Sequence, residues 1–215
     1  MKKLILGMLA AVVMTASVSA IEFSAGGEFG MVAQQYLNND GAFSTLQGSP
    51  LFGIVGNADF GGWGVQVSFD INSKSREQFT KDVDTKKWKW NNSYLGLTPY
   101  FTFKLGELNI AAGPVLGVCF YSYSYEDTLV SGSKGTFKES CSYFIWGTNV
   151  EARQTITDNI RGYVSLPVIF LSSNERNYSS AINGEASPKN ENYNKWTGLW
   201  NSVNFATKIG VVYVF

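Results

Sequence analysis

The chain has 215 residues, a formal net charge of zero at neutral pH, no histidine, and 16% charged against 15% aromatic residues. This length suits one domain. The even charge and the lack of a basic cluster argue against nucleic-acid binding, which needs cations to neutralise phosphates. Without histidine the commonest general base is missing, so the composition also argues against ordinary acid–base catalysis.

The first 20 residues have the pattern of a secretory signal peptide. Lys2 and Lys3 precede an apolar run at 4–14 that is too short to cross a bilayer, and small residues at 18–20 fit cleavage after Ala20. An uncleaved N-terminal membrane anchor is the alternative. Beyond Ala20 no apolar run approaches the ~20 residues that a spanning helix needs. We therefore predict a signal peptide at 1–20 and one exported domain at 21–215.

From residue 21 onward, apolar residues alternate with small or polar ones, which predicts β-strands with one apolar face. The predicted strands are 21–31, 50–60, 63–72, 91–105, 108–123, 141–156, 160–171 and 202–215. Tight turns are predicted at 61–62, 106–107 and 157–159. The polar segments between the hairpins are predicted to be long loops, at 34–49, 73–90, 124–140 and 172–201.

Two of the tight turns fix the pairing of their strands. The glycines at 61–62 set Phe60 opposite Trp63, Ala58 opposite Val65, Ile54 opposite Phe69 and Phe52 opposite Ile71. The turn at 106–107 aligns Phe103 with Ile110, Phe101 with Ala112 and Leu95 with Val118. In both hairpins the apolar faces coincide, as a single buried or lipid-facing surface requires.

Short turns on one side and long polar segments on the other are typical of an outer-membrane barrel. Most predicted strands reach the 9–11 residues that a tilted strand needs to cross the hydrocarbon. Pairing the last strand with the first closes the barrel and leaves no free edge. A soluble sandwich or a lipocalin-like barrel is the alternative, although such folds rarely separate short and long connections so cleanly.

The two faces of the predicted barrel differ in size and polarity. The apolar rows are too bulky for the interior of eight strands, so they are predicted to face lipid. The opposite rows then line the lumen, where the predicted polar network is Glu22, Glu28, Gln66, Asp70, Glu151, Arg153, Arg161 and Lys208. Because an unpaired buried charge is costly, we expect these charges to pair, with Glu22 and Glu28 beside Lys208.

Aromatic residues gather near both ends of the predicted strands, as the interfacial belts of membrane barrels do. The inner belt is predicted to contain Phe23, Phe60, Trp63, Phe103, Tyr213 and Phe215. The outer belt is predicted to contain Trp88, Trp90, Tyr121, Tyr123, Trp146 and Phe170.

The last strand ends in Phe215, with Tyr213, Val211 and Ile209 two, four and six positions before it. In this feature the chain resembles bacterial outer-membrane β-barrel proteins, and in size and layout the small OmpA-, OmpX- and OmpW-like barrels. The resemblance implies an all-β, eight-stranded, antiparallel up-and-down transmembrane barrel, surrounded as a monomer by outer-membrane lipid. It also implies that Ile209, Val211, Tyr213 and Phe215 form a signal for the barrel-assembly machinery.

For function, we predict a non-enzymatic envelope protein whose four long loops contact an extracellular ligand or a host surface. The enzyme families of this fold rely on a histidine, so the resemblance implies no activity, and no cofactor or metal is expected. The alternative is a narrow channel for small hydrophobic molecules. Pro99 and Pro114 face each other across two strands, either as kinks that help to close the barrel or as a weak wall for lateral exit.

Cys119 and Cys141 both fall on inward rows near the outer ends of adjacent predicted strands. An oxidising compartment permits a disulfide between them. Two buried free thiols are the alternative.

Overall fold

The computed structural model describes residues 21–36, 47–79, 85–128, 133–172, 177–182, 185–186 and 202–215. The predicted signal peptide at 1–20 lies outside the described residues. In the part of the chain that is described, no helix has the length and apolar character to cross a membrane.

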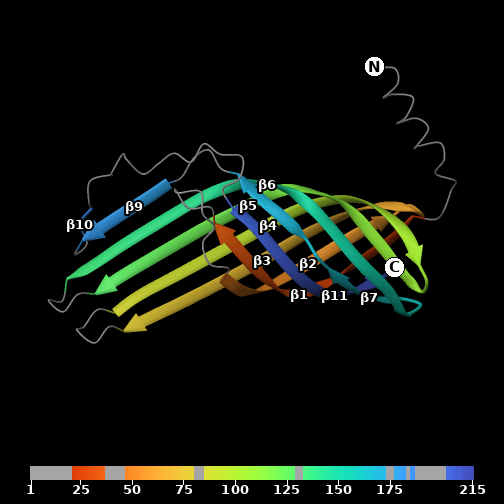
Figure 1. Ribbon diagram of the computed structural model, residues 1–215, viewed down its shortest axis with the longest axis horizontal. Helices are drawn as coiled ribbons and strands as arrows, with labels where there is room; N and C mark the ends of the chain where they lie inside the picture. The colour runs from red at the N-terminus through yellow and green to blue at the C-terminus, as the bar shows by residue number, and fades with distance from the viewer. Residues whose placement is uncertain are drawn as a thin grey trace, which may run out of the picture.

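The strands of the described residues all belong to one antiparallel sheet. They are β1 (Glu22–Tyr36), β2 (Gln47–Asp59), β3 (Trp63–Phe79), β4 (Thr85–Leu105), β5 (Leu108–Thr128), β6 (Lys134–Thr157), β7 (Ile160–Ser165), β8 (Val168–Ser172), β9 (Asn177–Ile182), β10 (Glu185–Ala186) and β11 (Ser202–Val214). β1 to β6 pair in chain order, and β7 and β8 share the next position between β6 and β11. β11 pairs back with β1, which closes a ring of eight positions (Figure 1). The predicted eight-stranded barrel is confirmed.

The turns at 61–62 and 106–107 set the register as predicted, whereas the turn predicted at 157–159 is one residue shorter, because Thr157 pairs with Ile160. Gly61 and Gly62 have φ angles of 75° and 135°, which side chains rarely adopt, and they bring Phe60 onto Trp63 with ring centroids 4.3 Å apart. The β2–β3 register pairs Ile54 with Phe69, and the predicted β4–β5 pairs are also present. The apolar faces of both hairpins therefore coincide.

Closure involves the whole length of the last strand. β11 pairs with β1 from Val214 opposite Ser24 to Ser202 opposite Tyr36. The amide of Val214 also donates to the carbonyl of Asn159, and that of Phe215 to the carbonyl of Phe23. The backbone of this end is thus hydrogen-bonded on both sides, which a strand in lipid requires.

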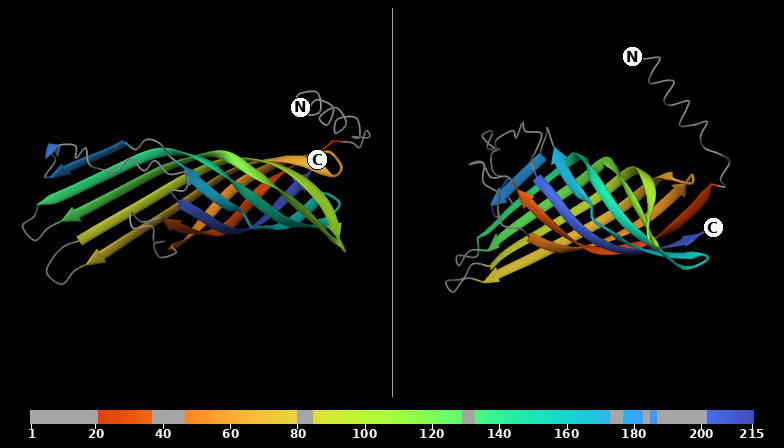
Figure 2. Two further views of the ribbon diagram at one scale, coloured as in Figure 1. Left: turned by 45° about the horizontal axis from the view of Figure 1, so that its top comes forward. Right: turned by 45° about the vertical axis from the view of Figure 1, so that its right-hand side comes forward.

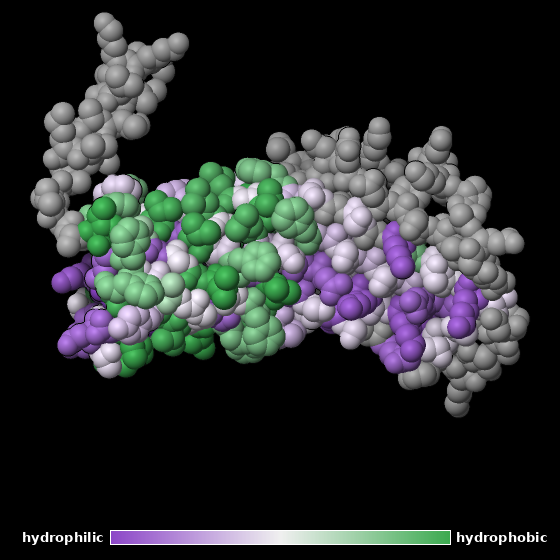
Figure 3. All heavy atoms as spheres, turned by 180° about the vertical axis from the view of Figure 1, so that it is seen from behind, coloured by the Kyte–Doolittle hydropathy of each residue, from purple (hydrophilic) through white to green (hydrophobic). Residues whose placement is uncertain are grey.

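The polarity of the barrel is the inverse of that of a soluble protein. Large apolar side chains point outward and are exposed, for example Phe101 at 69% and Ile209 at 63%. In contrast, Gln66 and Glu151 are buried, with exposures of 5% and 2%. Figure 3 shows the hydrophobic residues gathered over the barrel. An apolar outer surface with a polar interior suits a barrel surrounded by lipid.

The prediction of loops at 73–90 and 124–140 is wrong, because most of these residues continue β3 to β6. β3 pairs with β4 up to Phe79–Thr85, and β5 pairs with β6 up to Thr128–Lys134. Part of the predicted loop at 172–201 is also strand, since β9 pairs with β6. These strands project beyond β1, β2 and β11 as a sheet that we name the extension, residues 73–79, 85–91, 122–128 and 134–142 with β9 and β10 (Figures 1 and 2).

Candidate functional site

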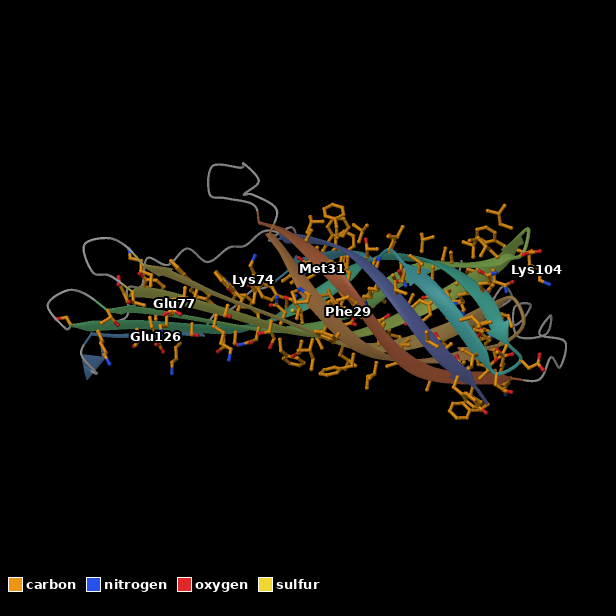
Figure 4. All side chains as sticks on the ribbon, turned by 90° about the horizontal axis from the view of Figure 1, so that it is seen from below. Phe29, Met31, Lys74, Glu77, Lys104 and Glu126 are labelled. Atoms are coloured by element: carbon orange, nitrogen blue, oxygen red, sulfur yellow. The ribbon has the colours of Figure 1, made fainter. Side chains whose placement is uncertain are left out.

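Two parts of the molecule carry candidate functional residues, the lumen of the barrel and the extension. Figure 4 shows how far apart the two ends of the molecule lie, with Glu77 and Glu126 on the extension and Lys104 beside a short turn.

At the short-turn end, the lumen begins with an ion pair between Glu22 and Arg161. Arg161 Nη2 donates to Glu22 Oε2 at 2.7 Å, and Nη1 donates to Oε1, in a bidentate arrangement. The expectation that Glu22 lies beside Lys208 is therefore wrong. The β11–β7 register explains it, since Arg161 is opposite Val212, near the end of β11 where β1 also begins.

The next group is built around Arg153. Its Nε donates to Glu151 Oε1 at 2.6 Å, and its guanidinium lies 4.3 Å from the centre of the Tyr100 ring. Gln66 Nε2 donates to Glu151 Oε2 at 3.0 Å and to Asn57 Oδ1 at 3.1 Å. Side chains from β2, β3, β4 and β6 thus meet across the lumen and hold opposite walls together.

A third group surrounds Lys208. Its ammonium donates to Glu28 Oε1 at 2.7 Å and to Asp70 Oδ2 at 2.6 Å, and Tyr163 OH donates to Glu28 Oε2 at 2.8 Å. The expected contact of Glu28 with Lys208 is present, and Asp70 is a second partner.

Sequence reasoning missed four members of these groups: Asn57, Tyr100, Tyr163, and Asp59, whose Oδ1 accepts from Arg153 Nη1 at 3.5 Å. All four lie on inward rows, so the alternation that selected Gln66 also pointed to them. The predicted network contains only carboxylate, amide, guanidinium and ammonium groups, so it leaves out both tyrosine hydroxyls. These hydroxyls donate to carboxylates inside the lumen, at 2.6 Å from Tyr100 to Asp59 and 2.8 Å from Tyr163 to Glu28.

Apolar side chains occupy the lumen nearer the extension. The cluster consists of Tyr94, Cys119, Tyr143, Ile145 and Leu171, each no more than 8% exposed, with Tyr121 and Ile169 packed against it. From the opposite wall, Asn204 Nδ2 donates to Tyr94 OH at 3.0 Å. Polar groups and this apolar cluster therefore fill successive levels of the lumen.

The two cysteines lie on adjacent strands but are not directly opposite each other. Cys119 pairs with Tyr143, and Cys141 pairs with Tyr121. Diagonal neighbours of this kind lie about 7–8 Å apart, beyond the usual Cα separation of a disulfide. The register therefore does not favour the predicted bridge, which would need a shift of the backbone.

The extension reverses the polarity of the barrel wall along the same strands. On β4 the row that lines the lumen at Tyr94 continues as Trp90 and Trp88, whose rings lie 5.5 Å and 5.6 Å from those of Tyr123 and Tyr125. Four residues predicted for the outer aromatic belt are thus on the inner face instead: Trp88, Trp90, Tyr121 and Tyr123.

The outer face of the extension is polar. Ser73 Oγ donates to Asn91 Oδ1 at 2.8 Å, and Asn91 Nδ2 donates to Ser122 Oγ at 3.3 Å, so a hydrogen-bonded row crosses three strands just above the apolar band. Further out, Lys87 and Glu77 form an exposed ion pair of 3.1 Å. This face has the character of a surface in water rather than in lipid.

Among the described residues, no group of three or more acidic, cysteine or histidine side chains could hold a metal ion. The residues predicted as an assembly signal, Ile209, Val211, Tyr213 and Phe215, form one outward, exposed row on β11 and just after it.

No family model matches the chain, and no curated protein does. A solved structure of a major outer membrane protein from Thermus thermophilus is similar, with 16% identity, a TM-score of 0.51, and coverage of 92% of this chain and all of that one. The attachment invasion locus protein Ail of Yersinia pestis matches with 13% identity and a TM-score of 0.45, over 90% of this chain and 99% of Ail. The outer membrane protease OmpT of Escherichia coli matches with 11% identity and a TM-score of 0.46, over 93% of this chain and all of OmpT. At such identities the likeness concerns the fold alone, and the chain has the fold of a bacterial outer-membrane β-barrel with eight strands.

Proposed function

We propose that the protein is a non-enzymatic outer-membrane barrel that presents the inner face of its extension to a partner outside the cell. The observation that carries this proposal is the reversed polarity of β3 to β6 beyond the barrel. The same strands that turn apolar rows to lipid turn aromatic side chains inward beyond the barrel: Trp88, Trp90, Tyr123, Tyr125 and Phe137.

Aromatic residues on a regular sheet are suited to recognition. Trp and Tyr are enriched in binding hot spots because they bury a large area and lose little side-chain freedom. Here each ring is half-buried and lies beside a ring on the neighbouring strand, so the surface is already ordered before a partner arrives. The strands are continuous with a closed barrel, which fixes their position relative to the membrane.

The filled lumen supports a binding role over free transport. Arg153, Lys208 and their acidic partners cross the lumen at two levels, and the apolar cluster around Tyr94 occupies a third. An interior of eight strands has little room beside such side chains. In this proposal the barrel is a monomeric anchor in outer-membrane lipid, and the assembly machinery recognises the row that ends in Phe215.

The proposal is tested by adhesion of whole cells to immobilised extracellular-matrix proteins and to a glycan array. Cells that produce the protein should bind at least one probe better than cells that lack it. A Trp88→Ala, Tyr125→Ala double variant should lose most of that binding. The matched control is Ser75→Ala, Ser124→Ala on the outer face of the same strands, which should keep it. No binding above the cells that lack the protein, or equal losses in both variants, would contradict the proposal.

A second candidate function is a narrow path for small hydrophobic molecules with lateral exit into the membrane. It is favoured by a gap in the β4–β5 ladder, which is continuous to Leu97–Leu116 and resumes only at Phe101–Ala112. Pro99 and Pro114 lie in this gap and have no amide hydrogen to donate. Against it, a side chain at Gly113 would overlap the carbonyl of Pro99, so the two strands lie close together there.

The second candidate predicts that restoring the amide hydrogens slows uptake. Cells with Pro99→Ala, Pro114→Ala should then take up a lipophilic fluorescent dye more slowly than cells with the wild-type protein. The same dye uptake with wild type, double variant and no protein would remove this candidate.

A further inference from the structure

The cluster of Glu28, Asp70 and Lys208 contains two acids and one base. All three are buried, with exposures of 8%, 3% and 6%. If both acids were ionised, the cluster would hold one uncompensated negative charge inside the barrel. Such a charge costs several kcal/mol in a buried site, so a native structure normally avoids it.

Among the described residues, the other polar groups that face the cluster do not supply a second positive charge. Tyr163 on β7 donates to Glu28 as a neutral hydroxyl, and Tyr94 on β4 is opposite Asp70 in the register. Arg153 on β6 pairs with Glu151 on the same strand, at 2.6 Å, and with Asp59 on β2, at 3.5 Å. The cluster therefore still contains one more acidic group than basic groups.

The hydrogen bonds show which carboxylate oxygen of the cluster has no donor. Both oxygens of Glu28 accept a hydrogen bond, Oε1 from Lys208 and Oε2 from Tyr163. Asp70 Oδ2 also accepts from Lys208, but Asp70 Oδ1 is buried and has no partner among the described residues. A buried acceptor without a donor is uncommon and calls for a physical reason.

Gly53 brings the two carboxyl groups together. It lies between Glu28 and Asp70 in the sheet, directly opposite both. A methyl group built on Gly53 would overlap Asp70 Oδ1 and would lie 3.0 Å from Glu28 Oε1. Both carboxyl groups thus converge over the bare backbone of this glycine.

We propose that Asp70 and Glu28 share one proton, so that the cluster is a proton-binding site in the lumen. A proton on Asp70 Oδ1 that is donated to Glu28 Oε1 gives the unpartnered oxygen a hydrogen bond. The same proton makes the cluster neutral, with one carboxylate facing one ammonium. Two carboxyl groups at close range commonly hold a single proton in this way, because both cannot easily be ionised.

The site links the stability of the barrel to pH. In the unfolded chain both carboxyl groups are exposed and ionised at neutral pH, whereas the folded barrel keeps one proton. The folded state therefore binds more protons, and stability is lost as the pH rises through the range in which the site releases its proton.

Infrared spectroscopy of the full chain, folded in lipid vesicles, tests the proposal directly. At about pH 6.5, where exposed Asp and Glu are ionised, the wild-type protein should show the C=O stretching band of a protonated carboxyl group. Asp70→Asn and Glu28→Gln should each remove the band. Glu22→Gln is the matched control and should keep it, because Glu22 pairs one-to-one with Arg161. Absence of the band in the wild type, or its survival in Asp70→Asn, would overturn the proposal.

Unfolding rates in guanidinium provide a second test. Between about pH 6.5 and about pH 9.5 the wild type should unfold several-fold faster at the higher pH, and Glu22→Gln should behave in the same way. Asp70→Asn should show little of this dependence, since its amide keeps the cluster neutral throughout. An equal dependence in Asp70→Asn would contradict the shared proton.

Discussion

Leu97→Arg should destabilise the barrel strongly, because this residue lies in the middle of the outward apolar band. Leu97 is 46% exposed, lies opposite Val67 on β3 and Leu116 on β5, and has Leu95 and Phe101 on the same row of β4. An arginine on the lipid face near the membrane midplane costs about 2–4 kcal/mol. That cost corresponds to a roughly 30- to 1000-fold lower folding equilibrium constant, since about 1.4 kcal/mol is one factor of ten.

The matched control is Ser124→Arg, on the outer face of the extension and above the apolar band. A surface change in water typically alters stability by no more than about 0.5 kcal/mol. Both variants would be measured by reversible guanidinium unfolding from lipid vesicles, followed by tryptophan fluorescence and by heat-dependent gel mobility. Equal and small effects of the two substitutions would refute the assignment of Leu97 to lipid.

Three further predictions concern the lumen and the end of the chain. Gly53→Ala should cost about 1–3 kcal/mol by overpacking, since its methyl group would overlap Asp70 Oδ1, whereas Gly27→Ala, which has room beside Gly53, should cost less in the same unfolding assay. Arg153→Ala should lower the free energy of unfolding by about 3–5 kcal/mol, because it leaves Glu151 without its cation. In planar-bilayer recordings the wild type should conduct no steady current, and Arg153→Ala should conduct more. A large, long-lived wild-type conductance would contradict the filled lumen. Deletion of Phe215 should reduce the folded barrel in outer-membrane fractions far more than Leu108→Ala does, and normal levels of heat-modifiable barrel would count against an assembly signal.

The barrel itself was predictable because alternation and turn chemistry agree. The glycines at 61–62 fixed one register and the turn at 106–107 fixed another, and the apolar rows were long enough to identify the lipid face. Both signals are local in sequence, so a single chain suffices to detect them.

The extension could not be predicted because aromatic residues face inward and charged residues face outward there, the reverse of the pattern in the barrel. In β4, Trp88 and Trp90 have the same parity as the lumen residues Asn92 and Tyr94, and the exposed lysines at 87 and 89 have the parity of the lipid-facing Leu95. A scan that expects apolar residues outward finds charge there and assigns a loop. Only the pairing of β3 with β4 and of β5 with β6 shows that the strands continue.

Which side chains meet in the lumen depends on the stagger between strands, and the alternation of apolar and polar residues does not give this stagger. Rows identify which residues face inward, but the stagger between the first and last strands decides which of them meet. Glu22 was therefore assigned to Lys208 although it binds Arg161, and Asp70 was not recognised as the second partner of Lys208. The offset of Cys119 from Cys141 depends on the β5–β6 register, which no tight turn fixes.

One continuous set of strands faces lipid over the barrel and water over the extension. Spin labels placed one at a time along β4 from Lys87 to Phe103, with accessibility to oxygen compared with that to a water-soluble quencher, test it most directly. We expect Leu95, Leu97 and Phe101 to be accessible to oxygen and Lys87 and Lys89 to be accessible to the aqueous quencher. Gly96, Thr98 and Tyr100 face the lumen and should be shielded from lipid. Oxygen accessibility at Lys87 and Lys89 equal to that at Leu97, or the strongest oxygen accessibility at the alternate residues Gly96 and Thr98, would contradict it.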